Sequence, residues 1–83
     1  MKVRIYTTPR CPKCKILKKF LARKGIQFEE LNLEDSDVAA ELIMRDVFDL
    51  TTPILEIGEK LYLEDDLFNN DELNVEKLER ILK

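Results

Sequence analysis

Hydrophobic and polar residues alternate at the start of the chain and then change to a helical spacing. In residues 2–7, Val3 and Ile5 alternate with polar or amphipathic neighbours, which predicts a strand. Further along, apolar side chains recur three and four positions apart, which predicts one face of a helix. The members of this face are Ile16, Leu17, Phe20 and Leu21.

Prolines and a glycine mark the ends of this helix. Pro9 and Pro12 end the preceding strand, and proline suits the first helical turn because no backbone N–H is needed there. We therefore expect the helix to begin at Cys11 or Pro12. Gly25 is suited to the C-terminal cap, where a left-handed residue commonly ends a helix.

Residues 26–33 predict a second strand, in which Ile26 and Phe28 occupy one face and Leu31 and Leu33 the opposite phase. The alternation slips near residues 29–30, so the pattern leaves the register undetermined. A strand, a helix and a strand in succession predict two parallel strands joined by a right-handed crossover.

The second half of the chain predicts two more helices and a hairpin. Asp35, Ser36 or Asp37 is expected to cap a helix that runs to about Phe48. The apolar set of this helix is Val38, Ala39, Leu42, Ile43, Val47 and Phe48.

The segment Thr51-Thr52-Pro53 interrupts the pattern before a hairpin that turns at Gly58. The hairpin's apolar residues are Ile54, Leu55, Ile57, Leu61, Tyr62 and Leu63. After an acidic run, Asn74 is expected to cap a last helix. The predicted buried stripe of that helix is Val75, Leu78, Ile81 and Leu82.

The length and composition limit the architecture. Eighty-three residues suffice for one small domain, which we assign to 1–83, and 45% hydrophobic residues are typical of a globular chain. No apolar run approaches the length of a membrane span, and the amino terminus lacks an apolar signal-peptide core. We therefore expect a cytoplasmic monomer without a membrane partner.

Positive charge is concentrated at the amino-terminal end. Residues 1–28 carry nine Lys or Arg and no acid, whereas residues 29–83 carry all 17 acids and five bases. This asymmetry favours either a surface that attracts an acidic partner or a solvated helix face. For Lys15, Lys18 or Lys19 taken singly, the solvated face is the simpler interpretation. Nucleic-acid binding is disfavoured because aromatic residues are not interleaved with the basic ones.

Cys11 and Cys14 are the only cysteines, and the chain has no histidine. A C-x-x-C pair beside a β-α-β pattern indicates dithiol redox chemistry. Cys11 is the expected nucleophile, because backbone N–H groups at a helix start and the charges of Arg10 and Lys13 favour its thiolate. Cys14, one turn inside the helix and less exposed, is the expected resolving thiol, and this exchange needs no metal or organic cofactor.

Two other functions remain compatible with these residues. A structural zinc site usually takes four ligands, so two cysteines would require a second chain or a carboxylate to complete it. Alternatively, the pair has no redox role, and the chain is a docking domain whose basic first helix binds an acidic partner.

The residues Cys11-Pro12-Lys13-Cys14 after a first strand resemble the glutaredoxin active site, which usually reads Cys-Pro-Tyr-Cys. Thr51-Thr52-Pro53 resembles the family's Thr-Val-Pro. The resemblance implies an α/β thioredoxin fold of the short glutaredoxin type, with a four-stranded mixed sheet in the order 2-1-3-4 flanked by three helices. It also implies a cis Thr52-Pro53 bond beside the cysteines.

The implied function is that of a protein dithiol-disulfide oxidoreductase or electron carrier acting on a disulfide-containing protein. Small members of this type reduce ribonucleotide reductase and take electrons from a thioredoxin-reductase-type enzyme, which makes both candidate partners. A glutathione-based reductant is the alternative. The residues assigned to substrate binding are Arg10, Pro12, Lys13, Thr52 and Pro53.

The chain departs from glutathione-binding glutaredoxins in two places. These proteins normally have a Gly-Gly pair followed by an aspartate after the last strand, where this chain has Glu64-Asp65-Asp66. Acidic side chains repel the carboxylates of glutathione, which argues against it as reductant. Asp65 or Asp66 is the candidate for the family's helix-capping acid. Thr8 replaces the family's lysine, for which Arg10 or Lys13 is a candidate substitute.

Overall fold

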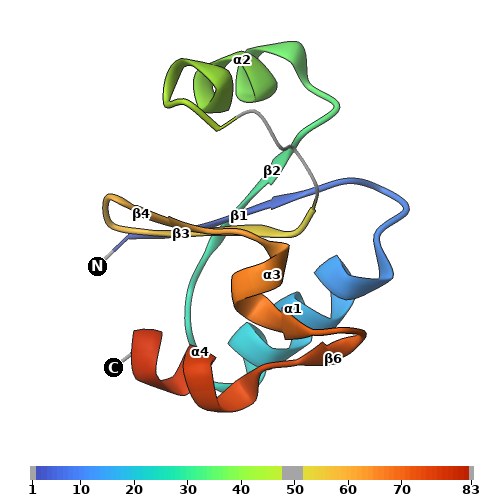
Figure 1. The fold of residues 1–83 in the computed structure, drawn as a ribbon, viewed down its shortest axis with the longest axis vertical. Coiled ribbons are helices and arrows are strands. Elements are labelled where there is room, and N and C mark those ends of the chain that lie inside the picture. Colours follow the sequence, from blue (N-terminus) through green and yellow to red (C-terminus); the bar gives the residue numbers. More distant parts are fainter. Residues whose placement is uncertain (1, 48–51, 83) are drawn as a thin grey trace.

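A four-stranded mixed sheet lies at the centre of the protein, a computed structural model of which describes residues 2–47 and 52–82 (Figure 1). Its strands, in chain order, are β1 (Val3–Thr7), β2 (Glu29–Asn32), β3 (Ile54–Ile57) and β4 (Lys60–Tyr62). The helices are α1 (Pro12–Arg23), α2 (Ser36–Met44), α3 (Glu64–Leu67) and α4 (Val75–Ile81). A separate two-stranded ribbon consists of β5 (Phe68–Asn69) and β6 (Glu72–Leu73).

The strand order is β2-β1-β3-β4, as the resemblance implied. β1 pairs in parallel with β2, and antiparallel with β3. Ile5 therefore lies between Glu30 on one neighbour and Leu55 on the other. Because directly paired residues project from the same face of a sheet, this register determines which side chains of the three strands meet.

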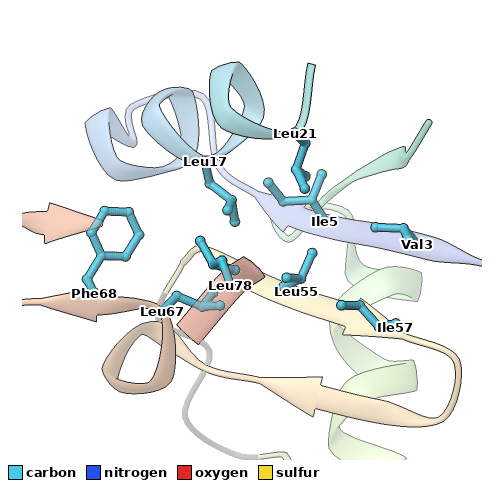
Figure 2. Close-up of a cluster of buried hydrophobic side chains, with 9 residues drawn as sticks. All are labelled: Val3, Ile5, Leu17, Leu21, Leu55, Ile57, Leu67, Phe68 and Leu78. Carbon is cyan, nitrogen blue, oxygen red and sulfur yellow. The ribbon is translucent and has the colours of Figure 1, made fainter. Parts of the chain in front are cut away.

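The two faces of the sheet are covered by different helices. α1, α3 and α4 lie on one side, and α2 lies on the other (Figure 1). Figure 2 shows the larger core cluster, in which side chains of α1, α3 and α4 meet those of β1 and β3. Its buried members are Val3, Ile5, Leu17, Leu21, Leu55, Ile57, Leu67, Phe68 and Leu78. The smaller cluster on the α2 side contains Tyr6, Leu33, Leu42 and Ile54.

The ends of α1 agree with the sequence-based prediction. Pro12 is the first helical residue, and Cys11 is the N-cap. At the other end Gly25 has φ +70° and donates its N–H to the carbonyl of Ala22 (3.0 Å). Ile26 donates to the carbonyl of Leu21 (3.0 Å), and these paired bonds terminate the helix in a Schellman motif.

The prediction of a second strand over residues 26–33 was too long, because β2 begins only at Glu29. Ile26 and Phe28 precede the strand and pack against the larger cluster. Leu31 packs against the smaller cluster on the α2 side. The slip in alternation therefore arises because the apolar residues belong to two different cores.

α2 is also shorter than predicted. Asp35 is its N-cap and accepts the N–H of Asp37 (2.9 Å), which selects one of three candidate caps. The helix ends at Met44, and Asp46 follows with φ +64°, a left-handed conformation that stops helical propagation. Ile43 was expected to be buried but is exposed. The predicted end at Phe48 lies outside the described residues.

A charged group is buried between α2 and the sheet. The Glu56 carboxylate accepts a hydrogen bond from the Tyr6 hydroxyl (2.6 Å) and pairs with Arg45 (3.1 Å). Burial and the Glu56 carboxylate raise the pKa of Tyr6 to about 12. The partners of Glu56 offset the cost of removing its charge from water.

The segment from Glu64 to Leu73 forms more structure than the sequence predicted. Its acidic run begins α3, where Asp66 accepts the N–H of Leu63 (3.2 Å) and negative charge is favoured by the helix dipole. α4 is capped by Asn74 as predicted, and Leu78 is buried. Val75, the first residue of α4, was expected in the buried stripe but is exposed, whereas Ile81 and Leu82 pack against the larger cluster.

Leu17→Ala is expected to lower the free energy of unfolding by about 2–5 kcal/mol, because it leaves a cavity beneath α1. Leu17 is fully buried, whereas its neighbour Ile16 is 41% exposed. Ile16→Ala is the matched control and should cost less than about 1.5 kcal/mol. Denaturant unfolding measures both variants, and equal losses would contradict this account of the core.

Candidate functional site

The two cysteines are joined by a disulfide at the start of α1, with their Cα atoms 5.2 Å apart. Cys11 is in extended conformation (φ −123°, ψ 99°), so its side chain projects at the N-terminal end of the helix. Cys14 lies one turn further along. Cys11 is 8% exposed and Cys14 only 2%, which agrees with the expected order of accessibility.

The backbone of the first helical turn supports negative charge on Cys11. The N–H of Cys14 donates to the Sγ atom of Cys11 (3.1 Å). The N–H groups of a first turn lack intrahelical partners, and the helix dipole is positive at this end. A hydrogen bond to the charged form of a group lowers its pKa, so this arrangement favours the Cys11 thiolate once the disulfide is reduced.

Lys13 does not supply the unpaired positive charge that its position suggested. Its ammonium group forms an ion pair with Glu64 of α3 and lies 3.8 Å from Asp71. The hydrogen bond to Glu64 raises the pKa of Lys13. The Lys13 Nζ atom also lies 5.4 Å from the centroid of the Phe68 ring. Arg10, at the start of the same motif, is exposed.

An open groove of about 620 Å³ lies beside Cys11. Its lining contains four of the five residues assigned to substrate binding; the full set is Arg10, Cys11, Pro12, Lys13, Ile16, Thr52 and Asp71. The fifth, Pro53, is fully buried and does not line the groove. The Thr52-Pro53 bond is cis, as the resemblance implied, and the Thr52 and Thr8 hydroxyls are 3.2 Å apart. Thr51 lies outside the described residues.

A second cavity, of about 300 Å³, is lined by both cysteines. Its lining residues are Thr7, Thr8, Pro9, Cys11, Cys14, Lys15, Lys18, Glu30 and Asn32. Glu30 accepts hydrogen bonds from the Thr7 hydroxyl (2.8 Å) and the Lys18 ammonium (3.0 Å). These bonds lower the pKa of Glu30.

Sequence reasoning did not identify Glu30 or Thr7 as site residues, and it treated Lys18 as part of a solvated face. Glu30 could have been identified only from the register of the parallel β1–β2 pair, which places it opposite Ile5, on the α1 side of the sheet. The slip in the apolar pattern at Glu29-Glu30 concealed this register. Glu30 therefore approaches the cysteines through strand pairing rather than through proximity in the sequence.

In residues 2–47 and 52–82, no three His, Cys, Asp or Glu side chains are grouped closely enough to hold a metal ion. None of the helices described there has the length and apolar character needed to cross a membrane.

Residues 3–62 match the family model of glutaredoxin. The chain belongs to the glutaredoxin family. A glutaredoxin-like 8.6 kDa protein encoded in the rubredoxin operon of Clostridium pasteurianum is 46% identical over 33 residues. That match covers 40% of this chain and 44% of the Clostridium protein.

Solved structures extend the likeness over more of this glutaredoxin-family chain. The thioredoxin-like protein BC3987 superimposes with a TM-score of 0.71 at 26% identity, over 96% of this chain and 99% of that one. A glutaredoxin from Archaeoglobus fulgidus gives 0.72 at 25% identity, over 99% and 86%. The glutaredoxin-like NrdH-redoxin of Escherichia coli gives 0.64 at 27% identity, over 76% and 82%. The family and the NrdH-redoxin likeness support thiol-disulfide oxidoreductase activity.

Glu64→Gln is expected to lower the pKa of Cys11, because it removes a negative charge that now compensates Lys13 beside the groove. The comparison is made in a Cys14→Ser background, where the rate of Cys11 alkylation is measured against pH. Glu76→Gln is the control, because Glu76 pairs with Arg80 on the outer side of α4. An unchanged Cys11 pKa in the Glu64 variant would show that Lys13 and Glu64 do not influence the thiol.

Proposed function

We propose that this protein is a dithiol-disulfide oxidoreductase that carries electrons to disulfides of other proteins. The observation that carries the proposal is the Cys11–Cys14 disulfide at a helix start, with its more exposed sulfur beside an open groove. A groove of about 620 Å³ is large enough for a few residues of a partner chain and not only for a small thiol.

In the proposed reaction the reduced protein begins with the Cys11 thiolate. It attacks one sulfur of the target disulfide, a bond forms between Cys11 and that sulfur, and the other target sulfur departs as a thiolate. Cys14 then attacks Cys11 and the mixed disulfide breaks, with its electron pair leaving on the target sulfur. Two electrons have passed to the target, and Cys11 and Cys14 are again a disulfide.

The proposed binding residues have distinct roles in this reaction. Thr52, which lines the groove together with Cys11, is proposed to contact an extended partner segment. Pro12 and Arg10 form the rim next to Cys11. Pro53, which is buried, acts by fixing the course of the backbone at Thr52 rather than by contact with the partner.

For the reductant we propose a thioredoxin-reductase-type enzyme rather than glutathione. Lys13, the cation between the cysteines, is already paired with Glu64, and Asp71 lies on the same groove. The carboxylates of glutathione would therefore meet Asp71 and a lysine whose charge is already paired, although the exposed Arg10 also lines the groove. No organic cofactor is required for thiol exchange. The structural similarity to NrdH-redoxin, which has a thioredoxin-like activity profile, supports a thioredoxin-reductase-type enzyme as the reductant.

Ribonucleotide reductase is the proposed example of a protein substrate, and the cytoplasm is the proposed compartment. Both proposals rest on the likeness to small glutaredoxin-like proteins and on the use of a cysteine pair for exchange, which a reducing compartment permits. Any target must present its disulfide on an accessible segment, because the sulfur of Cys11 lies in a groove and not on a projecting loop.

Cys11→Ser is expected to abolish reduction of a protein disulfide, because the attacking thiolate is lost. Cys14→Ser should retain the first step and accumulate a mixed disulfide with the target, which non-reducing electrophoresis and intact mass reveal. The proposal fails if Cys11→Ser retains activity, or if the wild-type dithiol does not oxidise in a mild disulfide buffer. Binding of an acidic partner that survives both substitutions would instead favour a docking domain.

The choice of reductant is tested by equilibrating the protein in a glutathione buffer and in a dithiol buffer, with intact mass as the readout. We expect an internal Cys11–Cys14 disulfide in both buffers under oxidising conditions and no stable glutathione adduct. In a coupled assay, a thioredoxin reductase should regenerate the dithiol faster than glutathione does. A stable adduct together with faster turnover in glutathione would contradict the proposed reductant.

A further inference from the structure

The cavity on the Cys14 side of the disulfide is separate in its lining from the groove beside Cys11. Both contain Cys11, but only this cavity contains Cys14. The charged residues that line it are Lys15 and Lys18 from α1 and Glu30 from β2, and its other lining residues are uncharged. Cys14 therefore lines the same cavity as three charged residues.

Two of these charges are held in place. The Lys18 ammonium lies 3.0 Å from the Glu30 carboxylate, which also accepts the hydroxyl hydrogen of Thr7. Thr7 is 4% exposed, so one end of this chain of hydrogen bonds is anchored in the protein interior. The Lys18 side chain is 32% exposed and the Glu30 side chain 44%, so solvent reduces their influence on a neighbouring group without removing it.

The second step of the proposed exchange requires a positive charge near Cys14. Cys14 must lose its proton before it attacks Cys11, and the resulting thiolate is nearly buried at the wall of the cavity. Burial alone disfavours the thiolate and raises the pKa of a thiol, whereas a nearby cation lowers it. Without such a cation, the resolving step would be slow near neutral pH.

We propose that Lys18 is the positioning residue for the Cys14 thiolate and that Glu30 holds and moderates its charge. This inference rests on the proposed function. When Cys14 loses its proton to solvent, the Lys18 ammonium shares its charge between Glu30 and the new thiolate. The thiolate's electron pair then forms the bond to Cys11, and the pair of the broken mixed disulfide leaves with the target sulfur, which takes up a proton from water.

If Lys18 and Glu30 have these roles, their neutral variants should shift the pKa of Cys14 in opposite directions. Removing the cation with Lys18→Gln should raise the pKa of Cys14 by about one unit, and removing the anion with Glu30→Gln should lower it. Lys18→Arg retains the positive charge and should restore the original value. Lys19→Gln is the matched control, since Lys19 is on the same helix but does not line the cavity.

The measurement uses a Cys11→Ser background, in which Cys14 is the only thiol, and follows thiolate absorbance against pH. The same substitutions in the two-cysteine protein are tested on a mixed disulfide of Cys11 with thionitrobenzoate, whose release reports resolution. Below the Cys14 pKa, Lys18→Gln should slow this release about threefold, because the loss of thiolate is partly offset by greater nucleophilicity. Circular dichroism confirms that each variant is folded.

The proposal is overturned if Lys18→Gln and Glu30→Gln leave the Cys14 pKa unchanged, or move it in the same direction. The proposal is also overturned if Lys18→Gln shifts the Cys14 pKa only as much as Lys19→Gln does, because the effect would then come from the overall charge of α1. Failure of this inference is distinguishable from failure of the proposed function, because the Cys14 titration needs no protein substrate and no reductase. If the proposed function were wrong, the wild-type protein itself would not exchange with any disulfide.

Discussion

The packing of α1 against the central sheet determines where the disulfide lies. Cys14, Leu17 and Leu21 are spaced three and four residues apart, so one face of the helix carries the inner sulfur and two fully buried leucines. The leucines contact the side of the sheet that bears Ile5 and Leu55, which anchors the helix along its length. The N-terminal turn is thereby held beside Thr52, although residues 12 and 52 are far apart in the chain. The difference in exposure between the two cysteines follows from this one helical face.

Several positive charges of the basic amino-terminal part of the chain form ion pairs in the folded structure. Lys13, Lys18 and Lys24 pair with Glu64, Glu30 and Glu79, respectively, and Arg4 pairs with Glu29. Each pair joins the first 28 residues to the acidic remainder. The structure therefore pairs part of this charge within the chain, beside the cysteines in the case of Lys13 and Lys18, and the surface that would attract an acidic partner is smaller than the composition indicates. Exposed pairs contribute little stability individually, so their main effect is to set the local potential.

The sequence predicted elements whose signals are local and failed where distant contacts decide. β1, the limits of α1, the β3–β4 hairpin and the cap at Asn74 follow from alternation, capping residues and turns, and the sheet order followed from a family resemblance. The end of α2 was missed because Asp46 adopts a left-handed conformation that aspartate only sometimes takes. The pairing of Lys13 with Glu64, and the approach of Glu30 to the cysteines, depend on the tertiary fold. The spacing of residues along the chain does not predict these two contacts.

The order of charges along the chain also matters before folding is complete. Residues 1–28, which contain β1 and α1, carry nine Lys or Arg, and the acids that pair with four of them are synthesised afterwards, the last of these acids within α4. Until then this amphipathic segment has an apolar helix face and no sheet to cover it. Mutual repulsion between such cationic segments opposes their association on neighbouring growing chains. The separation of charge thus opposes contact between exposed apolar faces during synthesis, and the charges of Arg4, Lys13, Lys18 and Lys24 form ion pairs in the folded chain.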